Sequence, residues 1–189
     1  MEKVIITLLT ICLLSFFFQN VIIKKKREYS KNKLERGNLI MADVRDVAQY
    51  FLSKESMSHK KLEKMCYYAQ AWYLANYGTP LVHNMFEAWV HGPVSPDLYS
   101  QYRGWGWSEI PQQPDNSIKF SEIELNLLEK VYDTYGEYTA DQLEAISHTE
   151  IPWLNARRGC SPNEYSRNPI SMIDMKNYYG ERIGRNYDR

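Results

Sequence analysis

The chain has 189 residues, of which 14% are aromatic and 24% charged, with equal numbers of basic and acidic side chains. This length suffices for one domain with a hydrophobic core, and the aromatic content argues against a disordered chain. Residues 1–40 carry a net charge of +5, which leaves −5 for residues 41–189. An acidic domain lacks the clustered Lys and Arg that neutralise phosphates, so we expect no nucleic-acid binding driven by bulk charge.

Residues 1–40 form an apolar and basic leader. An apolar run extends from Val4 to Ile23, and the basic run KKKR follows at 24–27. The first interpretation is a membrane anchor, because about 20 apolar residues approach spanning length and the basic cluster would keep the following domain in the cytoplasm. A signal peptide fits less well, since Lys3 alone would supply the basic n-region and no A-x-A-like cleavage site precedes the charges.

A mis-called start is the alternative to an anchor. The leader is rich in Ile, Leu, Phe, Lys and Asn, as an AT-rich intergenic stretch read in frame would be. Glu35-Arg36-Gly37 can be encoded by a purine-rich run that resembles a ribosome-binding site placed before Met41. The two hypotheses, a membrane anchor that uses residues 1–23 and a native start at Met41, both stay open.

From Met41 onwards the pattern predicts a helical domain. The first helix is expected over residues 44–53 with Asp43 as its N-cap. A second, longer helix begins after Ser58 and ends at Gly78, which favours the left-handed conformation that stops a helix. Cys66 falls on the apolar stripe of this helix and is interpreted as a buried hydrophobic residue, not a reactive thiol. Cys66 and Cys160 form no CxxC motif, so a reduced cytosolic chain fits as well as a disulfide.

The stretch EAWVHGPVSPDLY, residues 87–99, predicts a strand, a tight corner and a helix start. Phe86, Ala88 and Val90 alternate with Glu87, Trp89 and His91, which is the period of a strand. Gly92-Pro93 is expected to end the strand because proline has no N–H for a ladder. Ser95 is expected to cap the next helix with Pro96 in its first turn. Leu98, Tyr99 and Tyr102 would form the buried side of that helix.

The second half of the domain reads as a loop followed by further helices. The loop 104–117 carries Trp105 and Trp107, and a short strand at 118–120 is expected to pair with 86–90. Two capping-box patterns, Ser121 with Glu124 and Thr139 with Gln142, each start a helix. Residues 168–184 suit a final helix. The predicted fold class is mainly α (α+β): a compact helical domain of about five to seven helices with a small strand pair.

The sequence contains no recognisable catalytic, metal or cofactor motif. The four histidines match none of the usual zinc-binding spacings, and GxSxG and glycine-rich phosphate loops are absent. His91 is interpreted as a group that ties down the corner through a backbone carbonyl. The stretch His148-Thr149-Glu150 is interpreted as a cap for the following helix. A small hydrolase that uses His91 and Glu87 is kept as an alternative.

Several of these residues together resemble the signature of the Panacea domain, which occurs in the SocA-like and GepA-like proteins. The resemblance covers about 41–160 and has no place for residues 1–40, which supports a domain of 41–189 that starts at Met41. The matching residues, interpreted as structural, are Lys64, Tyr67, Tyr68, Trp72, Glu87, Ala88, Trp89, Gly92, Pro93, Val94, Pro96, Tyr99, Pro152 and Trp153.

This resemblance implies a cytoplasmic, non-enzymatic antitoxin that neutralises a co-encoded toxin of a bacterial or prophage toxin–antitoxin system. Some members of the family hand the toxin to a Clp-type protease as proteolytic adaptors. From the residues themselves, Trp105 and Trp107 are candidate partner-binding side chains, because large aromatics in a polar, glycine-flanked loop are suited to anchoring a partner. Tyr102, directly before this loop, is the third candidate. A membrane-tethered interaction protein is the remaining alternative.

Overall fold

The computed structural model describes residues 41–115 and 117–185, so the predicted leader lies outside the described residues. The helices are α2 (Val44–Lys54), α3 (His59–Tyr77), α4 (Pro96–Tyr102), α5 (Glu122–Tyr135), α6 (Ala140–His148), α7 (Ile151–Ala156) and α8 (Met172–Arg185). The strands are β1 (Met57–Ser58), β2 (Glu87–Trp89), β3 (Gly92–Val94) and β4 (Glu109–Ile110), and two short 3₁₀ helices are η1 (Arg103–Trp105) and η2 (Ser117–Lys119). Within the described ranges no helix is long and apolar enough to cross a bilayer.

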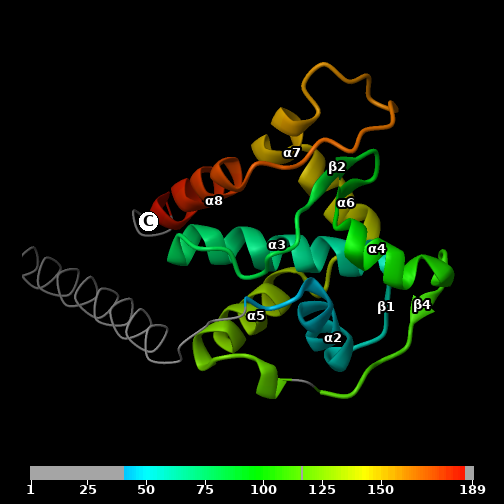
Figure 1. The fold of residues 1–189 in the computed structure, drawn as a ribbon, viewed down its shortest axis with the longest axis vertical. Helices are drawn as coiled ribbons and strands as arrows, with labels where there is room; N and C mark the ends of the chain where they lie inside the picture. Colours follow the sequence, from blue (N-terminus) through cyan, green and yellow to red (C-terminus); the bar gives the residue numbers. More distant parts are fainter. Residues whose placement is uncertain (1–40, 116, 186–189) are drawn as a thin grey trace, which may run out of the picture. The chain divides into compact units, whose positions relative to one another are not determined.

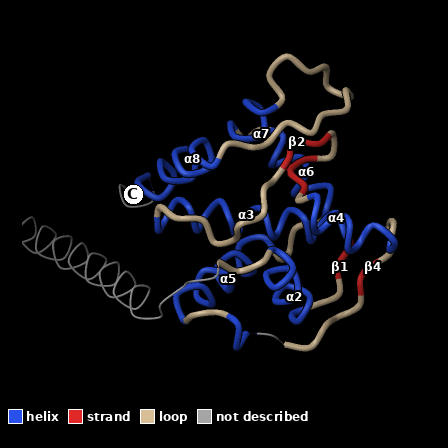
Figure 2. Tube along the Cα trace, viewed as in Figure 1, coloured by secondary structure: helices blue, strands red, loops and turns tan. Residues whose placement is uncertain are grey.

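The predicted fold class is confirmed. The described part of the chain holds seven α-helices and two two-stranded antiparallel sheets, β1–β4 and β2–β3. Figure 2 shows how short the strands are beside the helices. Helix α3 crosses the middle of the domain, with α8 along one side and α2 and α5 along the other (Figure 1). Because neighbours cover α3 nearly all round, 13 of its 19 residues are buried, far more than a single apolar stripe.

The helix boundaries follow from local capping chemistry. Asp43 accepts the N–H of Arg45 at the start of α2, and Ser58 accepts the N–H of Lys61 at the start of α3. Gly78 ends α3 with a φ of 74°, a conformation that residues with a Cβ rarely adopt. Both predicted capping boxes form, at Ser121/Glu124 in α5 and at Thr139/Gln142 in α6.

The predicted strand pairing was wrong. Residues 117–119 form the 3₁₀ helix η2, and β2 pairs instead with β3, the segment that was expected only to end the strand. The hairpin accommodates Pro93 because its cross-strand neighbour Ala88 bonds elsewhere: the Ala88 N–H donates to the Asn168 carbonyl, and its carbonyl accepts from Arg157. The missing proline N–H therefore costs the ladder nothing.

Helix α4 starts at the expected place, but its capping and its buried face differ from the prediction. Ser95 is the N-cap residue, yet its side chain makes no capping hydrogen bond. Leu98 and Tyr102 face inward as expected, whereas Tyr99 is 37% exposed. Tyr99 makes tilted ring contacts with Trp89 and His59, so it packs on the outside of the domain and is not part of the core.

Candidate functional site

The hairpin β2–β3 packs against a buried lysine of α3. The Lys64 side chain is 1% exposed, and its Nζ donates to the carbonyl of Pro93 at 3.1 Å. Gly92 has a φ of 97°, and a Cβ at this position would lie 2.5 Å from Lys64 Cε and 2.9 Å from Ser147 Oγ. Burial lowers the pKa of Lys64 to about 8, while Glu63 and Glu144 act in the opposite direction. Lys64 therefore supports the hairpin by packing against Gly92 and by its hydrogen bond to Pro93.

A second buried group of α3 binds the start of α4. Glu63 Oε2 accepts the N–H of Ser95 at 2.8 Å, and Glu63 Oε1 lies 3.1 Å from His59 Nε2. Burial raises the pKa of the Glu63 carboxyl, and the hydrogen bonds from His59 and Ser95 limit that rise. The residue before the helix is thus held through its own N–H by a carboxylate from another helix, while Ser95 Oγ caps no N–H of the first turn.

Helix α7 and the loop after it hold the outer side of the hairpin. Trp153 Nε1 donates to the Trp89 carbonyl at 3.1 Å. The buried Arg157 guanidinium donates to the Ala88 carbonyl and to three carbonyls of the following loop. Such a planar group with five donors suits several carbonyls at once. On the exposed edge, Glu87 accepts from Trp89 Nε1 at 2.6 Å and pairs with Arg167 at 3.0 Å.

The remaining signature residues lie in or beside the core. Tyr67 and Tyr68 are buried in α3, and Tyr68 stacks on Tyr135 with ring centroids 4.1 Å apart. Trp72 is half-buried and donates through Nε1 to the Tyr135 hydroxyl. The others occupy strand, helix-start and core positions: Ala88, Val94 and Pro152 are buried, and Pro96 is the first residue of α4. These placements fit the structural interpretation of the signature.

Glu150 was expected to help cap α7, and this expectation was wrong. Glu150 is the N-cap residue of α7 but makes no side-chain capping bond. It is buried where α3, α7 and α8 meet, and one carboxylate oxygen accepts from the hydroxyls of Tyr179 at 2.6 Å and Tyr68 at 3.3 Å. Burial raises the pKa of this carboxyl from 4.5 to about 7, and the two tyrosine hydroxyls oppose the rise.

This arrangement predicts a stability that falls as the pH rises. The folded state binds the Glu150 proton more tightly than the unfolded chain does. The contribution of this protonation to the unfolding free energy is therefore complete below pH 4.5 and is lost as the pH rises through 7. Glu150→Gln keeps an oxygen for both tyrosines and removes the titration. Between pH 4.5 and 7.5 the wild type should lose roughly 3 kcal/mol of unfolding free energy relative to the variant. Urea unfolding of both proteins across this pH range measures the difference, and parallel curves would contradict it.

The two histidines considered for chemistry have separate surroundings. His91 lies in the hairpin turn, largely exposed, with Nδ1 3.3 Å from Glu144 Oε1, so its partner is a carboxylate and not the expected carbonyl. His148 stacks on Trp153 with ring centroids 4.0 Å apart. Burial lowers the pKa of His148, which favours the neutral ring. Both histidines line a pocket of about 550 Å³ beside α7. Because Glu87 pairs with Arg167 and His91 with Glu144, the structure does not join them as the alternative hydrolase would require.

Two of the three candidate partner-binding residues, Trp105 and Trp107, lie at the tight turn that follows α4. We use the name aromatic turn for these two tryptophans together with the exposed Tyr99 of α4. Trp105 is 43% exposed and Trp107 is 82% exposed. Gly106, between them, has a φ of 56° and reverses the chain, with hydrogen bonds from its N–H to Arg103 and from the Ser108 N–H to Trp105. Tyr102, the third candidate, is only 9% exposed and packs near His59, so it faces inward as the helix pattern predicted and does not offer a contact surface.

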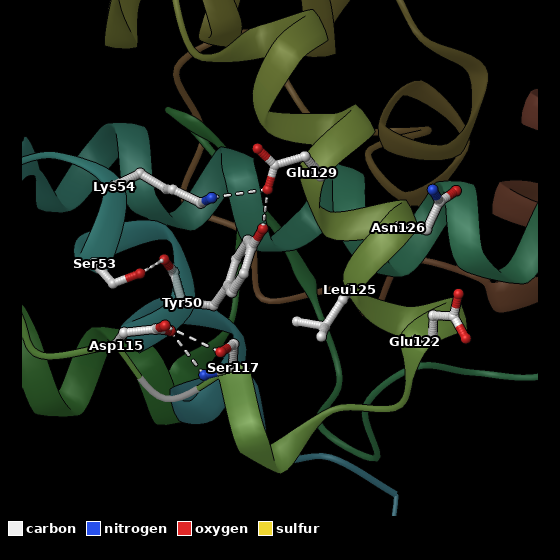
Figure 3. A pocket seen from close by; sticks show the side chains of 9 residues that line it. All are labelled: Tyr50, Ser53, Lys54, Asp115, Ser117, Glu122, Leu125, Asn126 and Glu129. Carbon is white, nitrogen blue, oxygen red and sulfur yellow. Dashed lines mark hydrogen bonds and ion pairs between the residues drawn. The ribbon is translucent and has the colours of Figure 1, made fainter.

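A second pocket, of about 540 Å³, lies between α2 and α5 (Figure 3). The Tyr50 hydroxyl donates to Glu129, and Lys54 pairs with the same carboxylate at 2.8 Å. Burial first, and Glu129 second, raise the pKa of the Tyr50 hydroxyl far above its usual value, which makes it a poor acid. The described residues include no group of three or more His, Cys, Asp or Glu that could hold a metal ion.

Sequence reasoning missed the buried contacts of three polar residues that organise this site, Glu63, Glu150 and Arg157, and considered Glu150 only as a helix cap. The spacing of His59 and Glu63, four residues apart on one helix, is the signal that predicts their mutual contact. The contact of Arg157 with the hairpin and that of Glu150 with α3 carry no such local signal, because Ala88 lies 69 residues from Arg157 and Tyr68 lies 82 residues from Glu150.

Comparisons with known proteins agree with the residue-level resemblance. A family model described as "Antitoxin SocA-like, Panacea domain" matches residues 62–154, from α3 through the hairpin and the aromatic turn to α7. The curated protein "Antitoxin SocA" of Caulobacter vibrioides (strain NA1000 / CB15N) is 31% identical over 128 residues, an alignment that covers 59% of this chain and 68% of that protein. No solved structure gives a significant match.

Proposed function

The chain belongs to the family of SocA-like antitoxins with a Panacea domain, and from this membership we propose that it binds and neutralises a toxin protein encoded beside it. The observation that carries the proposal is the similarity to a protein named an antitoxin, over a region that includes the hairpin and the aromatic turn. The proposed role is non-enzymatic and cytoplasmic. It needs a binding surface and no reacting group.

The aromatic turn is the proposed contact surface for the toxin. Its tryptophans are the largest exposed apolar side chains on α4, η1 and the turn that follows. Exposed tryptophans on a rigid turn are typical binding anchors, because they bury a large area on contact and have few rotatable bonds to restrict. The net charge of −5 on residues 41–189 would favour a basic toxin and would speed its association.

Neutralisation can proceed in two ways from the same complex. The domain can mask the toxin's active surface, or it can deliver the toxin to a Clp-type protease as an adaptor. The two mechanisms differ in the fate of the toxin: masking leaves its level constant, whereas delivery shortens its lifetime and requires the protease. We propose direct binding as the common first step.

Co-expression tests this proposal. The small gene adjacent to this one is induced alone, and then together with the full chain, while growth and the toxin level are followed. We expect the neighbouring product to stop growth alone and the full chain to restore it. A toxic neighbour that stays lethal although the full chain is present in excess would refute neutralisation. A toxin level that falls only when the Clp protease is present would identify the adaptor mechanism.

A further inference from the structure

The start of α4 is fixed from outside the helix. Ser95 makes no capping bond with its own side chain, and its buried hydroxyl has no hydrogen-bond partner in the part of the chain that the structure describes. Its N–H is bound instead by the Glu63 carboxylate of α3 at 2.8 Å. Glu63 therefore holds the N-cap residue of α4, beside Pro96 at the first helical position and the hydrogen bond from Asn84 to Asp97 in the first turn.

His59 connects the same carboxylate to the aromatic turn. Its Nε2 lies 3.1 Å from Glu63 Oε1, and in this arrangement we assign the proton to Nε2. Its ring packs against Tyr99, with centroids 5.3 Å apart, and against Tyr102, with centroids 6.5 Å apart. Glu63 therefore holds the first turn of α4 directly and its outer aromatic face through His59.

No flexible linker separates α4 from the segment that carries the two tryptophans. Helix α4 ends at Tyr102, and η1 begins at Arg103 and contains Trp105. A seven-residue helix spans about 10 Å. A change in the direction of its first turn is therefore carried along the helix to Trp105 and Trp107. Figure 1 shows α4 leading directly to the end of the domain where β4 begins.

We infer that Glu63 and His59 are positioning residues for the aromatic turn, which they hold in the orientation that a partner meets. The inference rests on the proposed function in one respect, that the aromatic turn is the partner-binding surface. It gives the buried His59–Glu63 pair a role that core packing alone does not explain. An apolar pair would fill the same space without leaving a polar group to be satisfied, but it could not bind the Ser95 N–H.

Hydrogen exchange of the full chain, followed by mass spectrometry, tests this inference without a partner. In Glu63→Ala the amides of residues 95–107 should exchange about tenfold faster or more, because a buried charge-assisted hydrogen bond is lost. The amides of α5 should change no more than in Glu150→Ala, a matched control that removes a buried carboxylate from the α8 side of α3. Glu63→Gln, whose amide oxygen can still accept the Ser95 N–H, should restore most of the protection.

The outcomes separate positioning from general stability and from the proposed function. Unchanged exchange at 95–107 in Glu63→Ala, or an equal acceleration in Glu150→Ala, overturns the inference. If Glu63→Ala does not fold, His59→Ala should still speed exchange in this segment beyond that in α5, and its failure to do so overturns the inference equally. Among these variants, the affinity for the toxin should fall in the same order as the protection of residues 95–107 from hydrogen exchange. A wild-type chain that binds no toxin refutes the proposed function, while the exchange data still decide the positioning role.

Discussion

Trp107→Ala should raise the Kd for the toxin about thirtyfold, which corresponds to a loss of about 2 kcal/mol of binding free energy. Trp107 is 82% exposed in the free chain, so its removal leaves no cavity, and the thermal midpoint should stay unchanged. Adding Trp105→Ala should weaken binding further. Titration calorimetry with the purified toxin gives the affinity, and circular dichroism gives the thermal midpoint.

A matched control for this prediction is Tyr165→Ala. Tyr165 is also a strongly exposed aromatic residue, but it lies in the loop between α7 and α8. Its replacement should leave the Kd within about twofold, because surface aromatics away from a contact contribute little to binding. Wild-type affinity in Trp107→Ala, or an equal loss in Tyr165→Ala, would contradict the assignment of the aromatic turn.

Gly92→Val should destabilise the domain by about 4 kcal/mol or more, enough to unfold many domains of this size. The backbone φ of 97° strongly disfavours a β-branched residue, and the new Cβ would lie 2.5 Å from Lys64 Cε. Lys64 would have to move, which would break its bond to the Pro93 carbonyl and leave a buried ammonium group without its acceptor. Urea unfolding, or the soluble yield if the variant does not fold, measures this effect.

Gly104→Ala is the matched control for this variant. No atom lies within 4 Å of a Cβ built at Gly104, and its φ lies outside the left-handed region. Its unfolding free energy should stay within about 0.5 kcal/mol of the wild type. A Gly92→Val chain that is as stable as wild type but no longer binds its partner would show that the hairpin corner is a contact surface and not a structural element.

The helices could be predicted because their ends are local. Asp43, Ser58 and the two capping boxes each satisfy backbone N–H groups two or three residues away, so the information lies within one turn. The hairpin could not be predicted in this way. The pairing of Gly92–Val94 with β2 involves residues that are distant in the sequence. The Ala88 N–H donates to the Asn168 carbonyl, the Ala88 carbonyl accepts from Arg157, and Lys64 packs against Gly92.

The candidate site was predictable only in part, for the same reason. Trp105 and Trp107 were identified because a polar, glycine-flanked loop predicts exposure, and both side chains are exposed. Tyr102 lies three residues before Trp105 but is buried, as the helix pattern predicted, so its choice as a partner-binding residue was wrong. The role inferred for Glu63 could not be predicted from its sequence neighbours either, because Glu63 accepts a hydrogen bond from the N–H of Ser95, 32 residues away.

The most direct measurement of the central claim is hydroxyl-radical footprinting of the full chain, alone and with the proposed toxin partner. Oxidation of Trp107 and Trp105 should fall strongly in the complex, while oxidation of the similarly exposed Tyr165 should stay constant. This result would place the toxin on the aromatic turn. A complex that forms while Trp107 remains as reactive as in the free chain would contradict the claim.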